Sequence, residues 1–575
     1  MAPRRALNWA GTFLPPLGVP RWFALAAALA LPLRGLLWWQ NLASPLGRYL
    51  TGDEYHYWQW AQKIAAGAWL PTEVFYNGPL FPYALAVLMS VVPSLSVLGL
   101  AAIQLLLNWI TCLMLLPLLR RWLEEKTALA ATTLALFFAP AAFFALKRMP
   151  PTLGMLLLVA GLLALPSGRG PWGRRSALAG ALLGLAVLTV PSIILALGAS
   201  ALFLCLRPPG GSRYLPAGVL LVAAFLVILP ATASNYLQDG SLVLVSGEYG
   251  GVFAQGNNPQ ATGSWSQLEG VSTSVTEESE DMARIARREA GRPLNRQQVT
   301  QHFLKRGLRF ILENPRAWLW LELRKAVLLA GGLDVPLDFS LARERRDFLP
   351  LLWAFPVSGT AVLLLASLGV LEVQVRSRLL LPLMAAAALG GTSLLFYVAN
   401  RYALPFELLL LPAAAGGIFA LPRLAARPWK ALAFLPVTAA ALLAAVALRD
   451  PSWEVDYLAK LVSAYNEAGD LPGVAQTLAS MTQIAPRSAF VFRVAGDLYR
   501  QHDDPQTALL AYDHALQLEP GDRDNRFARA TLLWEMGRGQ EAQAELGSIV
   551  KSDPEDQRAR AALEEFTRTL EALPR

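Results

Sequence analysis

Two adjacent acidic residues near the start of the chain have the types and spacing that catalysis can use. Asp53 and Glu54 are followed by Tyr55, His56 and three further aromatic residues before position 61. A positioned carboxylate can act as a general acid or base. Asp also accepts hydrogen bonds from the free N–H groups at a helix start, so Asp53 has a structural interpretation as the cap of a short helix. The residues alone leave both interpretations open.

Several cationic residues lie at the ends of apolar stretches or among apolar residues. Arg401 is followed by Tyr402, a hydrogen-bond donor, at the start of an apolar stretch. Lys147 and Arg148 end another apolar stretch, and Lys325 lies among Trp and Leu residues. Fixed positive charge stabilises the negative charge that develops in a transition state. Long basic side chains also extend toward water from apolar segments, and that explanation applies equally to Lys147, Arg148 and Lys325.

No metal-binding pattern accompanies these groups. The histidines lack the spacing of zinc ligands and both cysteines fall within apolar blocks, so we predict neither a zinc site nor a disulfide framework. The net charge of +8 comes from short Arg and Lys clusters between apolar blocks, a pattern typical of membrane proteins and not of nucleic-acid binding. The residues concerned are His56, His302, His502, His514, Cys112 and Cys205.

The elements that must position these groups are mostly membrane-spanning helices. Of the 575 residues, 54% are hydrophobic and 16% charged, which is too apolar for one soluble domain. Apolar blocks of roughly 20 residues, the length a helix needs to cross a bilayer, recur along the chain as far as residue 448. We predict an all-α, polytopic membrane domain over residues 1–450 with about eleven spans. These are 22–40, 97–119, 127–147, 150–166, 176–190, 192–206, 214–234, 349–371, 379–399, 403–421 and 431–448.

The basic clusters between the spans predict the orientation of the chain. If the N-terminus is cytoplasmic, this number of spans places every short basic loop inside, as the positive-inside rule requires. The apolar stretch 79–92 is too short to cross and is interpreted as an interfacial helix. Two large regions, 41–96 and 235–348, then face outward, and so does the chain after residue 450. We expect a multi-pass protein of the inner or plasma membrane.

The last quarter of the chain is predicted to be an α-solenoid of three tetratricopeptide repeats. The spacing of Pro486, Pro520 and Pro554 is 34 residues, the period of that repeat. The same period relates Tyr465, Tyr499 and Leu533, and also Val474, Ala508 and Ala542. Such solenoids bind peptides or proteins, and the alternative is a domain that only packs on the membrane part. The predicted units are 453–486, 487–520 and 521–554, with a capping helix over 555–571 in a domain of residues 453–575.

Four segments resemble the GT-C superfamily of glycosyltransferases, which use polyprenyl-phosphate sugars. The similarity is to the protein-mannosyltransferase-like members of family 39 and to the lipid A aminoarabinose-transferase-like members. The pair at 53–54 is similar to the acidic pair in that family's first external loop, and 77–82 to its Pro-Pro-Leu segment. Residues 247–258 are similar to a Gly-Asn-Asn loop of bacterial members that also carry tetratricopeptide repeats. Residues 400–405 are similar to an Arg-Tyr-x-x-Pro segment.

The resemblance implies an inverting transfer of a hexose or pentose to an acceptor outside the cytoplasm. It implies that Asp53 is the general base and that Glu54 orients the acceptor or binds a cation. Arg401 would hold the donor phosphate, with Tyr402 as a hydrogen-bond donor. The other residues expected at the site are Lys147, Arg148 and Lys325 for the donor phosphate, and Tyr55, His56, Asn77, Asn257 and Asn258 for the substrates.

The chain departs from the family pattern in two places. Residues 146–151 contain Lys147 and Arg148 where members often carry a second acid, so we predict no metal site and leave the cofactor undefined. Asn77 and Gly78 replace a basic residue or His followed by prolines, which affects donor contacts or sugar identity.

The predicted partners are a polyprenyl-phosphate sugar, membrane lipid, an acceptor that is protein, lipid or polysaccharide, and a protein or peptide on the repeats. Nucleic acid is not among them. Two other functions stay open: an enzyme like the O-antigen ligases or polymerases, and a non-catalytic membrane scaffold. The early acidic pair argues against the ligase, whose functional residues lie in a late external loop.

Overall fold

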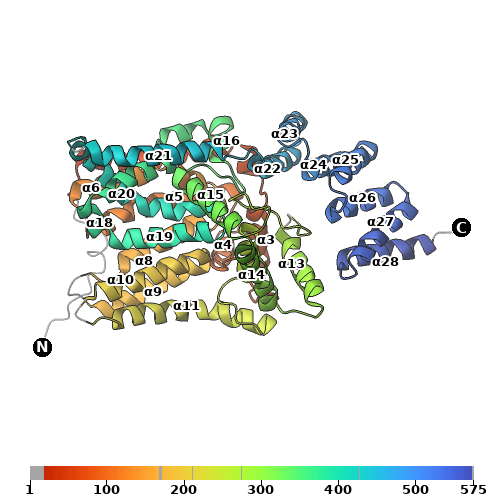
Figure 1. Cartoon of the computed structure of the whole chain (residues 1–575), viewed down its shortest axis with the longest axis horizontal. Helices are drawn as coiled ribbons and strands as arrows, with labels where there is room; N and C mark the ends of the chain where they lie inside the picture. The colour runs from red at the N-terminus through yellow and green to blue at the C-terminus, as the bar shows by residue number, and fades with distance from the viewer. Residues whose placement is uncertain (1–17, 168–170, 210–211, 273–274, 427, 573–575) are drawn as a thin grey trace.

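The computed structural model describes residues 18–167, 171–209, 212–272, 275–426 and 428–572. Within these ranges every regular element is a helix, and an isolated parallel β-bridge joins Phe138 to Val357. The predicted all-α class is therefore confirmed. Figure 1 shows the helices of the first three quarters of the chain packed together on the left and in the middle, and the helices after residue 470, drawn in blue, on the right.

Four helices in the described residues are long and apolar enough to cross a membrane. They are α1 (Arg21–Asn41), α5 (Val97–Leu119), α11 (Leu215–Asp239) and α20 (Asn400–Ala425). Shorter helices fill the rest of the bundle, and helices also form where the other spans were predicted. These are α6 (Glu125–Leu136), α7 (Ala139–Phe144), α8 (Pro151–Ala164), α9 (Trp172–Thr189), α10 (Ile194–Leu206), α17 (Gly359–Leu371), α18 (Val373–Arg378), α19 (Leu380–Leu395) and α21 (Pro428–Ala447).

Proline accounts for two breaks in this bundle. The segment predicted as a span over 127–147 is two short helices, because the chain leaves helical geometry at Phe138 and Pro140 begins a new one. The break predicted at Pro191 is found, since α9 ends at Thr189 and a 3₁₀ turn (Pro191–Ile193) precedes α10. A proline lacks the N–H group that would continue the helical hydrogen bonds.

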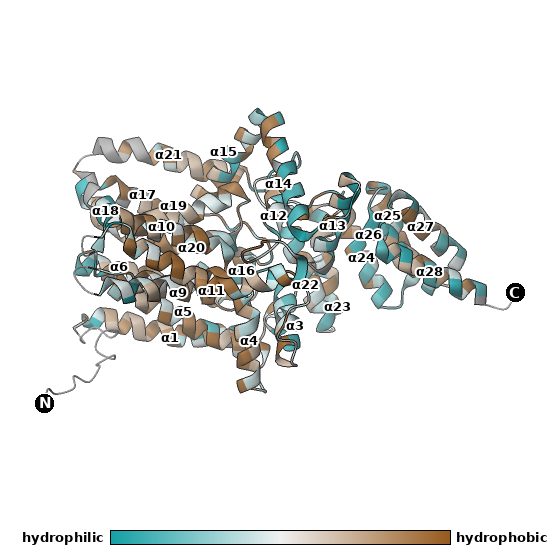
Figure 2. Ribbon diagram, turned by 90° about the horizontal axis from the view of Figure 1, so that it is seen from below, coloured by the Kyte–Doolittle hydropathy of each residue, from teal (hydrophilic) through white to brown (hydrophobic). Residues whose placement is uncertain are grey.

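The helices at one end of the bundle come from two regions of the chain, and several of them are polar, whereas α4 (Leu80–Val91) is apolar. Figure 2 shows the change from brown apolar helices to teal polar ones at this end. Gly52, with a φ of +53°, makes the turn into α3, and Asn295 and Gln298 form a capping box at the start of α14. The helices are α2 (Pro45–Arg48), α3 (Asp53–Ala65), α4 (Leu80–Val91), α12 (Tyr249–Gly256), α13 (Val275–Ala290), α14 (Arg296–Glu313), α15 (Pro315–Gly331) and α16 (Leu341–Asp347), with a 3₁₀ turn at Pro350–Ala354.

The C-terminal helices form three pairs and a final helix. Asp470 and Asp504, which are 34 residues apart in sequence, each accept a hydrogen bond from a backbone N–H group at the start of a second helix. The small residues Ala508 and Ala542 are completely buried, as close packing of each pair requires. The helices are α22 (Trp453–Glu467), α23 (Leu471–Ile484), α24 (Ala489–Gln501), α25 (Pro505–Leu518), α26 (Arg523–Glu535), α27 (Gly539–Ser552) and α28 (Gln557–Ala572).

The first repeat helix, α22, packs directly on the polar end of the membrane part. Tyr457 and Leu458 of α22 are buried in one apolar cluster with Leu46 of α2. Phe348, which follows α16, packs against the same cluster. This contact brings α22 beside the segment between α15 and α16, where the candidate site lies (Figure 1).

Candidate active site

The structure brings Asp53 and Arg401 together, although they are far apart in sequence. Asp53 is the first residue of α3 and Arg401 is the second residue of α20. Nη1 of Arg401 donates a hydrogen bond of 2.6 Å to Oδ2 of Asp53. Their side chains keep 12% and 16% of their surface exposed, so the pair is sheltered without being closed to solvent. Two of the residues predicted from separate motifs therefore share one site.

Two charged residues that the sequence did not single out extend this pair. Asp338, between α15 and α16, accepts a hydrogen bond from the same Nη1 atom of Arg401. Lys460 of α22 donates to the other carboxylate oxygen of Asp338 and, over 2.8 Å, to Asp456. Burial alone would raise the pKa of Asp338, but the charges of Arg401 and Lys460 outweigh it and lower that pKa to about 2. We call Asp53, Arg401, Asp338 and Lys460 the open cluster.

Hydrogen bonds of the Asn400 and Asp334 side chains hold the loop that carries Asp338 against α20. The side-chain amide of Asn400 donates to Asp334 over 2.7 Å and to the carbonyl oxygen of Phe339 over 2.8 Å. Asp334 also accepts hydrogen bonds from Ser340 and from the N–H group of Ala342. The start of α20 and the loop before α16 are therefore tied together on both sides of Asp338, so that its carboxylate has a fixed position.

The aromatic residues and the asparagine predicted at the site differ in their contact with the open cluster. The hydroxyl group of Tyr402 accepts a hydrogen bond of 3.0 Å from Arg401. The ring of His56 lies 6.0 Å from that of Tyr76, and burial lowers the pKa of His56 although the charge of Asp53 opposes this. Tyr55 is exposed, and Asn77 is partly buried next to Tyr76 in the chain. Of these, Tyr402 contacts the cluster directly.

Glu54, Lys147 and Arg148 occupy a separate, fully buried cluster. Glu54 accepts hydrogen bonds of 2.8 Å from both the side chain and the backbone N–H group of Arg148. Lys147 pairs with Glu344 of α16 at 2.7 Å and lies over the rings of Phe143 and Phe339. All four charged side chains are at most 1% exposed. We call Glu54, Arg148, Lys147 and Glu344 the closed cluster, because each charge has a partner inside it.

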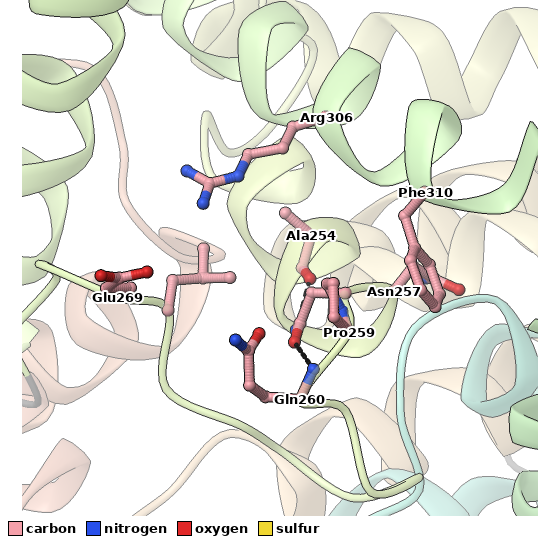
Figure 3. A pocket seen from close by; sticks show the side chains of 9 residues that line it. Ala254, Asn257, Pro259, Gln260, Glu269, Arg306 and Phe310 are labelled. Carbon is pink, nitrogen blue, oxygen red and sulfur yellow. Dashed lines mark hydrogen bonds between the residues drawn. The ribbon is translucent and has the colours of Figure 1, made fainter. Parts of the chain in front are cut away.

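Asn257, Asn258 and Lys325 lie together in a third place. Lys325 donates to Asn257 over 3.3 Å, to Glu322 over 2.7 Å and to the carbonyl oxygen of Leu394 over 3.0 Å. The amide groups of both asparagines bind backbone carbonyls and fix the loop after α12. A cavity of about 250 Å³ adjoins this loop, and Figure 3 shows Arg306, Gln260 and Phe310 around it. Its lining residues are Ala254, Asn257, Asn258, Pro259, Gln260, Leu268, Glu269, Arg306 and Phe310.

Glu278 of α13 is a further titratable residue near the open cluster that sequence reasoning missed. Its carboxylate accepts hydrogen bonds from Tyr76 over 2.6 Å and from Gln255 over 2.5 Å. Burial, together with the nearby charge of Glu248, raises the pKa of Glu278 to about 7 against the opposing hydrogen bonds. The charge of Asp53 contributes to the same shift, which links Glu278 electrostatically to the open cluster. The sequence carried no motif that would have distinguished Glu278 from its neighbours Glu277 and Glu280.

No arrangement of three or more His, Cys, Asp or Glu side chains that could hold a metal ion occurs among the residues the structure describes. The oxygen groups around Asp53 are paired with Arg401 and Lys460.

Comparison with known proteins identifies the repeats directly. The tetratricopeptide-repeat family profile matches residues 499–565, so the predicted repeat type is confirmed there. A comparison of the sequence with curated proteins gives no match.

The chain is similar to several solved structures, among them the following two. One is the oligosaccharyltransferase AglB from Archaeoglobus fulgidus in complex with an inhibitory peptide and a dolichol-phosphate, at 15% identity and a TM-score of 0.39. The match covers 78% of this chain and 59% of that one, so this chain spans about three fifths of the archaeal structure's length. The other is ArnT from Cupriavidus metallidurans bound to undecaprenyl phosphate, at 18% identity and a TM-score of 0.32, covering 69% of this chain and 78% of that one.

Proposed function

We propose that this chain is a membrane glycosyltransferase that moves a sugar from a polyprenyl-phosphate donor to an acceptor on the outer side of the membrane. The pairing of Asp53 with Arg401 carries this proposal. It joins an acid that can act as a base to a cation that can bind a phosphate, at the polar end of an apolar helix bundle. A donor anchored by its lipid tail presents its sugar at such a boundary.

In the proposed reaction Asp53 acts as the general base. Its carboxylate takes the proton from the acceptor hydroxyl group while the oxygen of that group forms a bond to the anomeric carbon. The bond between the anomeric carbon and the phosphate oxygen breaks, and its electron pair leaves with the polyprenyl phosphate. Attack from the side opposite the leaving group inverts the anomeric configuration. This displacement needs no covalent intermediate with the protein.

Arg401 binds the phosphate of the donor and stabilises the charge that the leaving oxygen acquires. A guanidinium group suits this role because it is permanently charged and offers several planar N–H donors. In the structure these donors already contact Asp53, Asp338 and Tyr402. A donor phosphate that takes over the contact with Asp53 also releases that carboxylate to accept the proton. Donor binding and activation of the base are then one event.

The other predicted site residues have different roles in the proposed reaction. Glu54, Lys147 and Arg148 are given no chemical step, since their charges are satisfied within the closed cluster. His56 and Tyr55 follow Asp53 on α3, and we propose that they form the acceptor side of the site. Asn257 and Lys325 shape the loop after α12. We propose that Asn77 and Asn258 contact the substrates in the same outer region.

We further propose that the open cluster and the repeats lie on the outer side, with the N-terminus in the cytoplasm. The basic loops between the predicted spans support this orientation. A reporter enzyme that is active only outside the cytoplasm, fused after Pro451, tests it. Activity of the fusion is expected, and an inactive fusion with an active cytoplasmic reporter at the same position would overturn the orientation.

The replacement of Asp53 by Asn tests the proposed function. Membranes that contain the protein are supplied with a labelled polyprenyl-phosphate sugar and envelope extract, and the label transferred to protein, lipid and polysaccharide is measured. Transfer is expected with the parent protein and is expected to be lost with Asp53→Asn. Unchanged transfer by the variant would rule out the assigned base. If the parent protein transfers no label from any donor yet recruits proteins through its repeats, it is a scaffold.

A further inference from the structure

The repeat domain contributes a charged side chain to the open cluster. Lys460 is partly buried at the contact between α22 and the loop before α16, where its ammonium group binds Asp338. Its aliphatic part lies against Gly52, the residue before Asp53, so closely that a Cβ atom on Gly52 would come within 2.9 Å of the Lys460 Cε atom. Lys460 therefore touches both the acid that shares Arg401 and the turn that positions Asp53.

The charges of the open cluster show what Lys460 does there. Arg401 is contacted by two carboxylates, those of Asp53 and Asp338, through one nitrogen atom. Lys460 pairs with Asp338, and its charge helps to keep the Asp338 carboxylate ionised. In turn, the charges of Asp338 and Asp456 raise the pKa of Lys460 against the effect of burial, so that the lysine stays protonated. Without Lys460, the full charge of Asp338 would act on Arg401 alone. Arg401 would then hold Asp338 more strongly and be less available to an incoming phosphate.

The repeat domain, which carries Lys460, contacts the rest of the protein at both of its ends. At one end, Glu454 of α22 pairs with Arg343 and Arg449, next to the apolar contact with α2. At the other end, the repeats hold α13 through ion pairs along one helical face. These pairs are Glu277 with Arg558 at 2.6 Å, Asp281 with Arg523 at 2.5 Å, and Arg284 and Arg288 with Asp553.

We infer that Lys460 is a positioning residue of the transferase site, and that the repeat domain is thereby one wall of that site as well as a module for partners. By neutralising Asp338 it keeps Arg401 free to exchange Asp53 for the donor phosphate. This inference rests on the proposed function and adds a residue from outside the membrane part to it.

A double-replacement experiment on the full-length protein in membranes tests the inference. Lys460→Met is expected to raise the KM for the polyprenyl-phosphate sugar by roughly tenfold, with a smaller change in kcat, because the partners of one charged network are coupled. Adding Asp338→Asn to Lys460→Met removes the acid that then competes for Arg401. The double variant is expected to return to within about threefold of the parent KM.

Lys551→Met, an exposed lysine on α27 of the same domain, is the matched control and is expected to leave both constants unchanged. Equal KM values for the parent protein and Lys460→Met would overturn the inference. So would a double variant as impaired as the single one, because Lys460 would then act only by docking the repeats. Both results presuppose measurable transfer by the parent protein, so they are distinct from failure of the proposed function.

Discussion

The closed cluster and the open cluster contain the same kinds of residue but differ in how their charges are paired and exposed. Each contains two acids and two bases, and each receives one member of the pair Asp53 and Glu54. Because successive residues of a helix point about 100° apart, α3 sends Glu54 into the protein and Asp53 toward α20. In the closed cluster every acid has its own base and water is excluded. In the open cluster one guanidinium is shared by two carboxylates and part of it is accessible.

The difference teaches that exchangeable partners, and not charge itself, set the proposed site apart from the closed cluster. A fully buried ion pair resists the loss of either member, since the remaining charge would be left unpaired in an apolar surrounding. A shared and partly exposed cation can change partners at small cost, which a binding site for an anionic donor requires. Adjacent acids can therefore differ completely in role.

The largest expected effect separates the two clusters by activity. Asp53→Asn should lower transfer by about 10²- to 10⁴-fold, the range for loss of a general base. The free energy of unfolding should change by less than about 1 kcal/mol, because Asn keeps the size of Asp and the site is partly open. Transfer assays and thermal unfolding in detergent measure the two quantities. A variant that is both inactive and unstable would mean that Asp53 belongs to the fold, as Glu54 does.

A replacement in the closed cluster should lower the stability of the protein. Arg148→Met leaves the carboxylate of Glu54 buried without its partner, and should lower the free energy of unfolding by about 3–5 kcal/mol. Arg148→Met combined with Glu54→Leu removes both charges and should recover most of this loss. Thermal unfolding of the two variants in detergent is the measurement. A stable Arg148→Met protein with no transfer activity would instead assign Arg148 to the chemistry.

The ion pairs between α13 and the repeats test whether burial sets how much stability is lost when an ion pair is broken. Arg523→Met leaves the buried carboxylates of Asp281 and Asp556 without their shared cation and should loosen α13 by about 2 kcal/mol or more. Arg558→Met removes an exposed partner of Glu277 and should cost less than about 1 kcal/mol. Hydrogen exchange of the α13 amides measures both. Equal effects of the two replacements would show that exposure does not separate these pairs.

The smallest expected effect is a pH dependence that arises at Glu278. Its pKa is about 7 in the folded protein, raised from 4.5, so the protonated carboxyl group is favoured in the native state. Its contribution to stability is complete below the unfolded value and is lost as the pH rises through about 7. Amide exchange in α13, after correction for its intrinsic pH dependence, should therefore increase as the pH rises from about 4.5 to about 7 and then level off. Glu278→Gln should remove that increase, and an unchanged profile in the variant would assign it to another group.

Much of the fold was predictable because it depends on periodic patterns. Hydrophobic blocks predicted the places of the bundle helices, and the spacing of 34 residues predicted the helix pairs. The break at Pro191 followed from proline chemistry. The interruption at Phe138 was not predicted, although Pro140 follows it, and a tertiary contact between Phe138 and Val357 accompanies the break.

The candidate site was predictable only where a local motif marked it. Asp53, Arg401 and Tyr402 came from motifs, and the structure brings them into contact. Asp338 and Lys460 lie in segments without a distinctive pattern, and their roles arise from the docking of α22 on the loop before α16. Glu54 could not be told apart from Asp53, because the direction of a side chain on α3 depends on the packing around that helix. Lys147 found its partner in Glu344, nearly two hundred residues away.

The place of Lys460 in the chain has a consequence for how the protein is made. Synthesis proceeds from the N-terminus, so Asp53 emerges early, Arg401 much later and Lys460 only with the first repeat. Until α22 has been translated and has docked, Asp338 lacks its second cation. A nascent or prematurely terminated chain can insert its apolar helices while its charged cluster is still incomplete. The order of synthesis therefore delays completion of the open cluster until the first repeat helix has been made and has docked.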